Sequence, residues 1–110
     1  MTLTYNQETF YCTMLLTKNN VPLLGKTCTV SIMRNSDNKF LDITNSSWGT
    51  EVKNVLTEIQ DGIYSLGFIP KNYNNNLDTY TLIYKYDENN LIYPKVETIK
   101  TIRKNSSKLV

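Results

Sequence analysis

The sequence contains no histidine and no alanine, and only four of its 110 residues are glycine. Without histidine, a Cys–His catalytic pair is excluded, and a general base would have to be a carboxylate or a lysine. Without alanine, the residue with the highest helix propensity is missing. The glycines form neither a phosphate-binding loop nor a nucleophile elbow. We therefore expect a protein that is not an enzyme, with no catalytic residue and no cofactor.

Long apolar runs are also missing, because the longest ones, such as residues 14–16, are far too short to span a membrane. Residues 1–8 lack the basic start of a secretory signal, and no apolar core follows them. The net charge of +2 is too small to indicate nucleic-acid binding. These features predict a protein that is made in a cytosol and stays there unless an assembly carries it out, without membrane or nucleic-acid partners.

The residues that are present favour β-strands, because Tyr, Thr, Ile and Val are plentiful. Hydrophobic residues make up 40% of the chain, which is enough for one folded domain of ordinary size. Apolar and polar residues alternate between turn signals, as expected of half-buried strands. The alternating runs are residues 9–18, 26–34, 39–43, 63–69, 79–86 and 91–102. Their expected inward residues include Phe10, Cys12, Met14, Leu16, Cys28, Val30, Ile32, Tyr64, Leu66, Phe68, Tyr80, Leu82, Tyr84, Tyr86 and Val96.

Residues 50–60 have an apolar spacing that fits either one helical face or an irregular strand. The all-β context favours the strand. With it, about seven strands follow one another at roughly 8–12-residue spacing, which predicts an immunoglobulin-like β-sandwich of antiparallel strands. We expect one domain over residues 9–103, an N-terminal arm over residues 1–8 and a polar C-terminal tail over residues 104–110.

The two cysteines, Cys12 and Cys28, allow either a disulfide or two buried thiols. A hairpin turn centred near Pro22 would place Cys12 opposite a residue near Met33. Cys28 would then lie roughly 16 Å out of register along the strand, which is beyond bridging distance. The sequence therefore favours two free thiols.

Tyr80 stands two residues before Leu82 at the start of the penultimate predicted strand. This is the pattern of a tyrosine corner, in which the phenol oxygen bonds the backbone upstream and pins the crossover between the sheets. In antibody domains a cysteine takes the place of Leu82. An ordinary alternating strand is the alternative, and both interpretations are structural.

The aromatic residues suggest where a partner could bind. Trp48 is the only tryptophan, and it is either an interface anchor or a lid packed over the end of the sandwich, which we favour. Four of the eight tyrosines have no clear inward position and could form a contact surface for a protein or a glycan. These are Tyr5, Tyr11, Tyr73 and Tyr93. A codon bias toward tyrosine is the alternative explanation.

The aspartates all fall at turns and form no cluster in the sequence. Calcium would need several oxygen atoms converging from one loop. We therefore expect turn chemistry and no metal site. These acids are Asp37, Asp42, Asp61, Asp78 and Asp87.

Five short pieces of the chain together resemble small immunoglobulin-like or transthyretin-like sandwich domains in the virion proteins of tailed bacteriophages. They are Gly25-Lys26-Thr27-Cys28-Thr29-Val30-Ser31-Ile32, Ser36-Asp37-Asn38-Lys39-Phe40-Leu41-Asp42, Trp48, Asp61-Gly62-Ile63-Tyr64 and Asp78-Thr79-Tyr80-Thr81. The resemblance covers about residues 21–102. It implies a non-enzymatic structural protein, with no catalytic residue to carry over. The domain stands alone here, whereas such modules are often appended to larger proteins.

The resemblance implies an auxiliary or decoration capsid protein that is assembled into the virion in the host cytoplasm. Its partners would be other virion proteins, such as the major capsid protein or connector proteins, with self-association into a homo-oligomer as an option. A tail, collar or head-to-tail connector component is one alternative. A glycan-binding or adhesion module that stacks sugars on exposed tyrosines is the other, although the sequence shows no export route for it.

Overall fold

The computed structural model describes residues 2–5, 8–70, 79–88, 91–92 and 95–102. Over these residues the protein is all-β and contains no helix, so the all-β part of the predicted fold class is confirmed. The strands are β1 (Thr2–Tyr5), β2 (Phe10–Leu15), β3 (Thr17–Lys18), β4 (Val21–Pro22), β5 (Cys28–Arg34), β6 (Lys39–Asp42), β7 (Ser47–Gly49), β8 (Asn54–Val55), β9 (Thr57–Gln60), β10 (Ile63–Phe68), β11 (Thr79–Glu88), β12 (Leu91–Ile92) and β13 (Lys95–Ile102).

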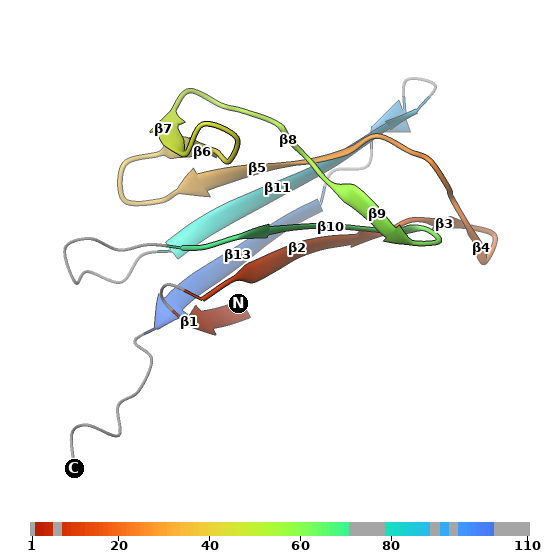
Figure 1. Ribbon diagram of the computed structural model, residues 1–110, viewed down its shortest axis with the longest axis horizontal. Helices are drawn as coiled ribbons and strands as arrows, with labels where there is room; N and C mark the ends of the chain where they lie inside the picture. Colours follow the sequence, from red (N-terminus) through yellow and green to blue (C-terminus); the bar gives the residue numbers. More distant parts are fainter. Residues whose placement is uncertain (1, 6–7, 71–78, 89–90, 93–94, 103–110) are drawn as a thin grey trace, which may run out of the picture.

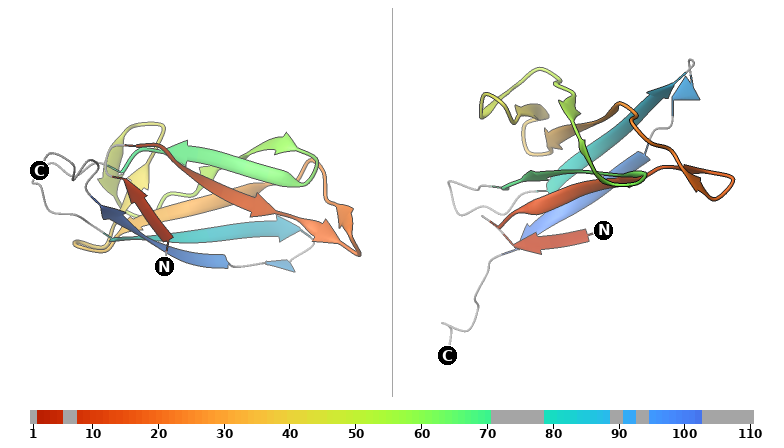
Figure 2. Two further views of the ribbon diagram at one scale, coloured as in Figure 1. Left: turned by 90° about the horizontal axis from the view of Figure 1, so that it is seen from below. Right: turned by 45° about the vertical axis from the view of Figure 1, so that its right-hand side comes forward.

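The strands form two main layers. The larger sheet has the order β1-β13-β11-β5-β6-β7, with β8 added to β5 and β12 added to β11. The smaller sheet has the order β2-β10-β9 and lies across the larger one, as Figures 1 and 2 show. The β3–β4 hairpin extends beyond the sheets at one end (Figure 1). The arrangement is consistent with a β-sandwich, whose core lies between the two layers.

The residues predicted to face inward in β2, β5, β10 and β11 are buried or half-buried. In β11 the four described buried residues come at every second position, and β2 follows the same rule. In β5, Ser31 is buried in addition to the alternating Cys28, Val30 and Ile32. The buried core consists of Cys12, Met14, Leu16, Cys28, Val30, Ile32, Leu56, Tyr64, Phe68, Tyr80, Leu82, Tyr84, Tyr86 and Ile99. Leu66 is half-buried and packs against this core.

The expected pairing of the first two long strands is wrong. A tight turn at Asn19 and Asn20, with φ angles of 53° and 64°, closes only the short β3–β4 hairpin. Such positive φ values at both central residues are typical of a type I′ turn. The chain then crosses to the other layer, so β2 pairs with β10 while β5 pairs with β11. Both cysteines are nevertheless free and buried, as predicted.

Residues 50–60 form strands, as favoured, but the two strands belong to different sheets. β8 pairs with β5, whereas β9 pairs with β10. The switch occurs at Leu56, whose N–H donates to the Cys28 carbonyl oxygen at 2.9 Å. The apolar spacing was misleading because Asn54 is buried, while Val55 and Ile59 are exposed.

Two predictions about the chain ends need correction. Residues 1–8 were expected to form an arm, but β1 pairs in parallel with β13 and so belongs to the larger sheet. This pair also breaks the expected all-antiparallel arrangement. In β13 the expected inward Val96 is exposed, and Ile99 and Thr101 are buried instead. The predicted tail at residues 104–110 lies outside the described residues.

Candidate interaction surfaces

Tyr80 and Leu82 are both fully buried at the positions predicted for them. The ring of Tyr80 packs edge-on against Phe68, with ring centroids 5.8 Å apart. A tyrosine corner would bond the backbone just upstream, and residues 71–78 lie outside the described residues. The corner therefore stays a prediction, while the core position of Tyr80 is clear.

Tyr64 holds a crossover to the smaller sheet, a role that the sequence interpretation missed. Its hydroxyl donates to the Leu23 carbonyl oxygen at 2.7 Å and accepts from the Lys26 N–H at 2.9 Å. It thereby fixes the chain between β4 and β5 against β10. The available signal was a tyrosine at an inward position, because a buried phenol needs a partner for its hydroxyl.

Trp48 lies half-buried on the edge strand β7, in agreement with the lid interpretation. Its indole stacks on Tyr80, with ring centroids 6.1 Å apart and an interplanar angle of 28°. The Arg34 guanidinium carbon lies 4.2 Å from the centroid of the indole ring. Such a cation–π contact helps to hold the ring in place.

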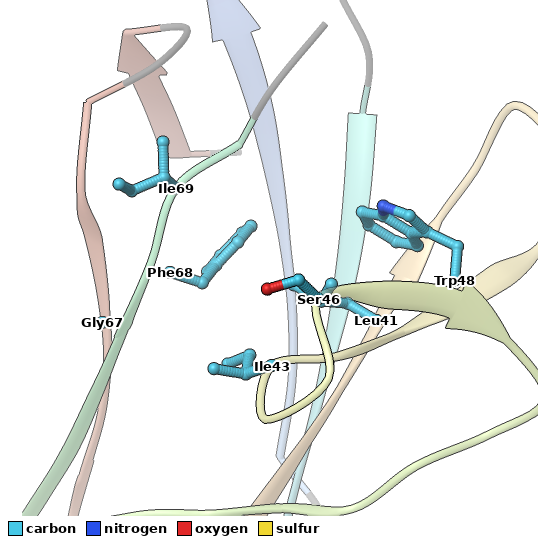
Figure 3. A pocket seen from close by; sticks show the side chains of 7 residues that line it. All are labelled: Leu41, Ile43, Ser46, Trp48, Gly67, Phe68 and Ile69. Atoms are coloured by element: carbon cyan, nitrogen blue, oxygen red, sulfur yellow. The ribbon is translucent and has the colours of Figure 1, made fainter.

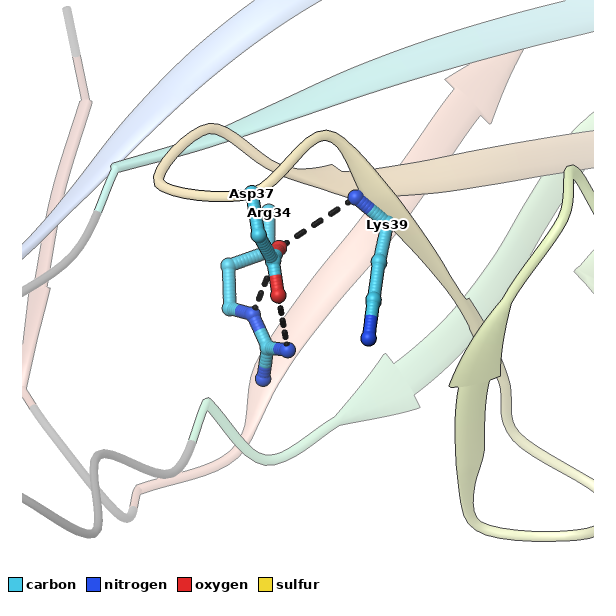
Figure 4. Close-up of polar contacts among 3 residues, drawn as sticks. All are labelled: Arg34, Asp37 and Lys39. Atoms are coloured by element: carbon cyan, nitrogen blue, oxygen red, sulfur yellow. Dashed lines mark hydrogen bonds and ion pairs between the residues drawn. The ribbon is translucent and has the colours of Figure 1, made fainter.

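The turn beside Trp48 fixes that arginine (Figure 4). Arg34 donates from Nε and Nη2 to the Asp37 carboxylate, at 3.0 and 2.6 Å. The Lys39 N–H also donates to Asp37, at 3.3 Å. The pKa of Asp37 is lowered to about 2, and the hydrogen bonds from Arg34 are the largest cause. The predicted turn chemistry of Asp37 is therefore confirmed.

A cavity of about 310 Å³ opens between the two layers next to Trp48. In Figure 3 its walls come from the β6–β7 hairpin on one side and from the end of β10 on the other. The lining is mostly apolar and consists of Leu41, Ile43, Ser46, Trp48, Gly67, Phe68 and Ile69. A second cavity of about 220 Å³ adjoins it and shares Ile43, and it reaches Lys53 and Leu66.

The buried Asn54 lines the second cavity. Its side-chain nitrogen donates to the carbonyl oxygens of Val30 and Leu41, both at 3.1 Å. Its side-chain oxygen accepts from the Ile43 N–H at 3.1 Å. This buried amide links the segments that contain Val30, Leu41 and Ile43. The signal in the sequence was a lone asparagine within the apolar pattern of residues 50–60, because a buried amide needs hydrogen-bond partners.

The outer face of the smaller sheet carries no charged side chain. Three of its apolar residues are strongly exposed: Tyr11 at 66%, Leu15 at 67% and Ile59 at 62%. The other residues on this face, placed by strand register, are Thr13, Thr57, Gln60, Ile63, Ser65 and Gly67. Lys85 and Lys100 lie on the outer face of the larger sheet, so the two faces differ in charge.

Tyr11 is the one predicted contact tyrosine whose side chain the structure describes. A Cβ placed on Gly67 would lie 3.1 Å from its Cε1 atom, so its ring covers that glycine on the neighbouring strand. Tyr73 and Tyr93 lie outside the described residues, and only the backbone of Tyr5 is described.

Buried thiol and hydroxyl groups among the described residues include those of Cys28, Tyr84 and Ser31. Burial raises the pKa of the Cys28 thiol to about 11, which disfavours the nucleophilic thiolate. Burial also raises the pKa of Tyr84, beside Cys12, and its hydroxyl donates to Glu97 at 2.9 Å. Ser31, almost fully buried, donates to Glu51 at 3.0 Å.

Residues 2–5, 8–70, 79–88, 91–92 and 95–102 show neither a metal-binding cluster nor a membrane-spanning helix. This part of the chain brings no three His, Cys, Asp or Glu side chains together in a way that could hold a metal ion. It also has no helix with the length and apolar character needed to cross a membrane.

Comparison with known proteins found no similarity on which an assignment could rest. No protein-family model matches the chain, and neither a curated protein nor a solved structure does.

Proposed function

We propose that the chain is a non-enzymatic structural protein of a tailed-bacteriophage virion, an auxiliary capsid protein that binds other virion proteins. The observation that carries the proposal is the uncharged outer face of the smaller sheet. Tyr11, Leu15 and Ile59 expose most of their surface there, and contact surfaces are depleted of charge at their centre. The resemblance of the sequence to virion domains points to the kind of partner.

The strand order supports the finer part of the proposal, an immunoglobulin-like sandwich. In this interpretation β2, β10 and β9 correspond to strands B, E and D. The series β13, β11 and β5 corresponds to G, F and C, and β6 and β7 take the places of C′ and C″. Cys12 and Leu82 would then take the places of the two bridging cysteines of antibody domains, which agrees with the absence of a disulfide.

The environment of the polar side chains supports the non-enzymatic part. Ser31 is buried beneath Glu51, which also faces Lys85 at 4.0 Å. The Cys28 thiol is buried with a raised pKa. The Ser31 hydroxyl and the Cys28 thiol are therefore shielded from a substrate. A glycan-binding role stays a prediction of the sequence. Tyr11 is one of the tyrosines expected to stack sugars, and its ring packs over Gly67.

Mass spectrometry of purified virions of the phage that encodes the chain tests the proposal. We expect the protein at a fixed copy number per particle. The variant Leu15→Lys should be lost from the particles, because it places a charge on the uncharged face. The matched variant Val96→Lys, at an equally exposed site on β13 (63% against 67%), should still be incorporated.

Absence of the wild-type protein from the particles would refute the virion proposal. Equal incorporation of the two lysine variants would refute the role of the outer face.

A further inference from the structure

The β3–β4 hairpin projects beyond both sheets, and contacts at its base fix its position (Figure 1). The Leu23 N–H donates to the Leu16 carbonyl oxygen at 3.0 Å, and the Leu16 N–H donates to the Gly62 carbonyl oxygen at 2.8 Å. A Cβ on Gly62 would lie 2.9 Å from the Cβ of Pro22, so the glycine lets the hairpin approach β10 closely. The hairpin is therefore firmly attached, although β3 and β4 add no residue to the buried core.

The Glu58 carboxylate strengthens this attachment, because it links the two turns at the base of the hairpin. Its Oε1 accepts from the Gly25 N–H at 3.0 Å, and its Oε2 accepts from the Gly62 N–H at 3.1 Å. Both glycines have positive φ angles, 65° and 76°, which suit glycine best. A partner that contacts the hairpin thus meets a preorganised surface, and little conformational freedom is lost on binding.

The tip of this hairpin exposes an apolar side chain. Val21 is 61% exposed and directly follows the tight turn at Asn19 and Asn20. Lys18 lies opposite Val21 in the strand register and carries the single charge of β3 and β4. Its long side chain can keep the ammonium group in water. The hairpin therefore presents one fixed valine to a partner.

An apolar cavity lies at the other end of β10. The base of the hairpin meets this strand at Gly62, whereas Phe68 and Ile69 line the cavity. The strand from Ile63 to Phe68 is roughly 17 Å long. Figure 1 shows the hairpin and the β6–β7 wall of the cavity at opposite ends of the sandwich. The hairpin cannot reach the cavity of its own chain, so a contact between the two has to join different copies.

The cavity has the size and the chemistry to hold a valine side chain. None of its lining residues is charged, and the rings of Trp48 and Phe68 stand on opposite sides of it (Figure 3). An apolar cavity of roughly 150 Å³ holds a benzene molecule, and a valine side chain has only half as many carbon atoms. The volume of about 310 Å³ therefore accommodates Val21 of a second copy.

We infer that the β3–β4 hairpin of one copy inserts Val21 into the cavity beside Trp48 of a second copy. An apolar side chain on one part of a molecule and a pocket on another part form a heterologous contact, which links copies head to tail. The series closes into a ring or continues as a filament, depending on the rotation between neighbours. The inference goes beyond the proposed capsid function, since it concerns identical chains and does not use the outer face of the smaller sheet.

The contact is small, which sets the conditions under which it forms. A stable specific interface needs roughly 1,000 Å² of buried surface, which the tip of one hairpin does not supply. Free copies should therefore associate only at high protein concentration. Copies that an assembly holds side by side should associate more readily, because a second attachment raises their effective concentration.

Trp48 is the only tryptophan of the chain, so its fluorescence reports on the cavity. We expect the emission maximum of the full chain to move to shorter wavelength as the protein concentration rises from micromolar to millimolar, because insertion excludes water from the indole. Val21→Asp should abolish this shift, since burial of a charge in an apolar cavity is unfavourable. Val96→Asp, at a similarly exposed site on β13 (63% against 61%), should keep it.

Crosslinking identifies the two ends of the contact. The variants Val21→Cys and Ser46→Cys, the second at a residue that lines the cavity, are mixed and oxidised at high concentration. We expect a larger share of mixed disulfide dimers than a control mixture of Val96→Cys and Ser46→Cys gives. The buried thiols of Cys12 and Cys28 should not compete.

An emission maximum that does not change with concentration would overturn the inference. A shift that Val21→Asp leaves intact would also overturn it, as would a share of mixed dimers no larger than in the control mixture. Leu15→Lys, which tests the outer face, should leave the fluorescence shift unchanged. Absence of the shift has no bearing on whether the protein is found in virions, so the two proposals fail separately.

Discussion

The side chains in the interior of the protein are packed more closely at its centre than at one of its edges. At the centre, Leu82, Ile32 and Tyr84 are fully buried and alternate strictly along paired strands. At the edge between the β6–β7 hairpin and β10, Trp48 and Ile43 are only partly buried and line a cavity of about 310 Å³. The centre has continuous strand pairing, whereas β9 leaves β10 at the edge. Close packing therefore occurs where the strand pairing is complete, and a cavity lies where the pairing ends.

Truncation of a side chain at the centre should have the largest effect on stability. Leu82→Ala should lower the free energy of unfolding by about 2–5 kcal/mol, because it opens a cavity in a closed core. Ile43→Ala should cost less, since this side chain already borders an empty space. Urea denaturation at pH 7 measures both changes. Equal losses would show that the edge is packed as tightly as the centre.

Asn54→Ala should have the next largest effect, because it acts on the boundary between the two regions. It would leave two carbonyl oxygens and one N–H without their present partner. The expected loss is about 2–3 kcal/mol. Asn45→Ala, an exposed position bonded to Asp42, is the matched control and should change the urea midpoint little. A small effect of Asn54→Ala would mean that water replaces the amide.

Tyr64→Phe tests the crossover between the layers while keeping the ring. The variant loses the bonds to the Leu23 carbonyl oxygen and the Lys26 N–H. The free energy of unfolding should fall by about 1–2 kcal/mol, with amide exchange accelerated around Lys26. Tyr11→Phe, at an exposed ring, serves as the control. A loss of the same size in both variants would contradict the proposed pinning role.

The smallest effect should appear at the turn beside Trp48, as a dependence on pH. Asp37 has a pKa of about 2 in the folded protein, against about 3.9 in an unfolded chain. A carboxyl group whose pKa is lowered by folding stabilises the fold at pH values above its pKa in the unfolded chain. This contribution is lost as the pH falls from about 4 to 2. The stability difference between wild type and Asp37→Asn should therefore shrink over this range. A constant difference across urea midpoints measured from pH 5 to pH 2 would contradict the prediction.

The candidate site was only partly predictable from the sequence. Trp48 stood out as a single tryptophan, and its place at the edge agrees with the favoured lid interpretation. The cavity beside Trp48 was not visible, since it lies between the β6–β7 hairpin and β10, which are distant in the sequence. Asn54 was overlooked within the pattern of residues 50–60, where the apolar Val55 and Ile59 face outward.

The sequence by itself determined where the strands run and which residues of β2, β5, β10 and β11 face inward. It could do so because the two-residue alternation of a strand is local. Only the tertiary structure decided that β2 and β5 lie in different sheets, that β1 joins β13, and that Val96 faces outward. These outcomes depend on pairing between distant segments, which a local pattern does not encode. The cavity beside Trp48 belongs to this second group, because segments that are distant in the sequence form its walls.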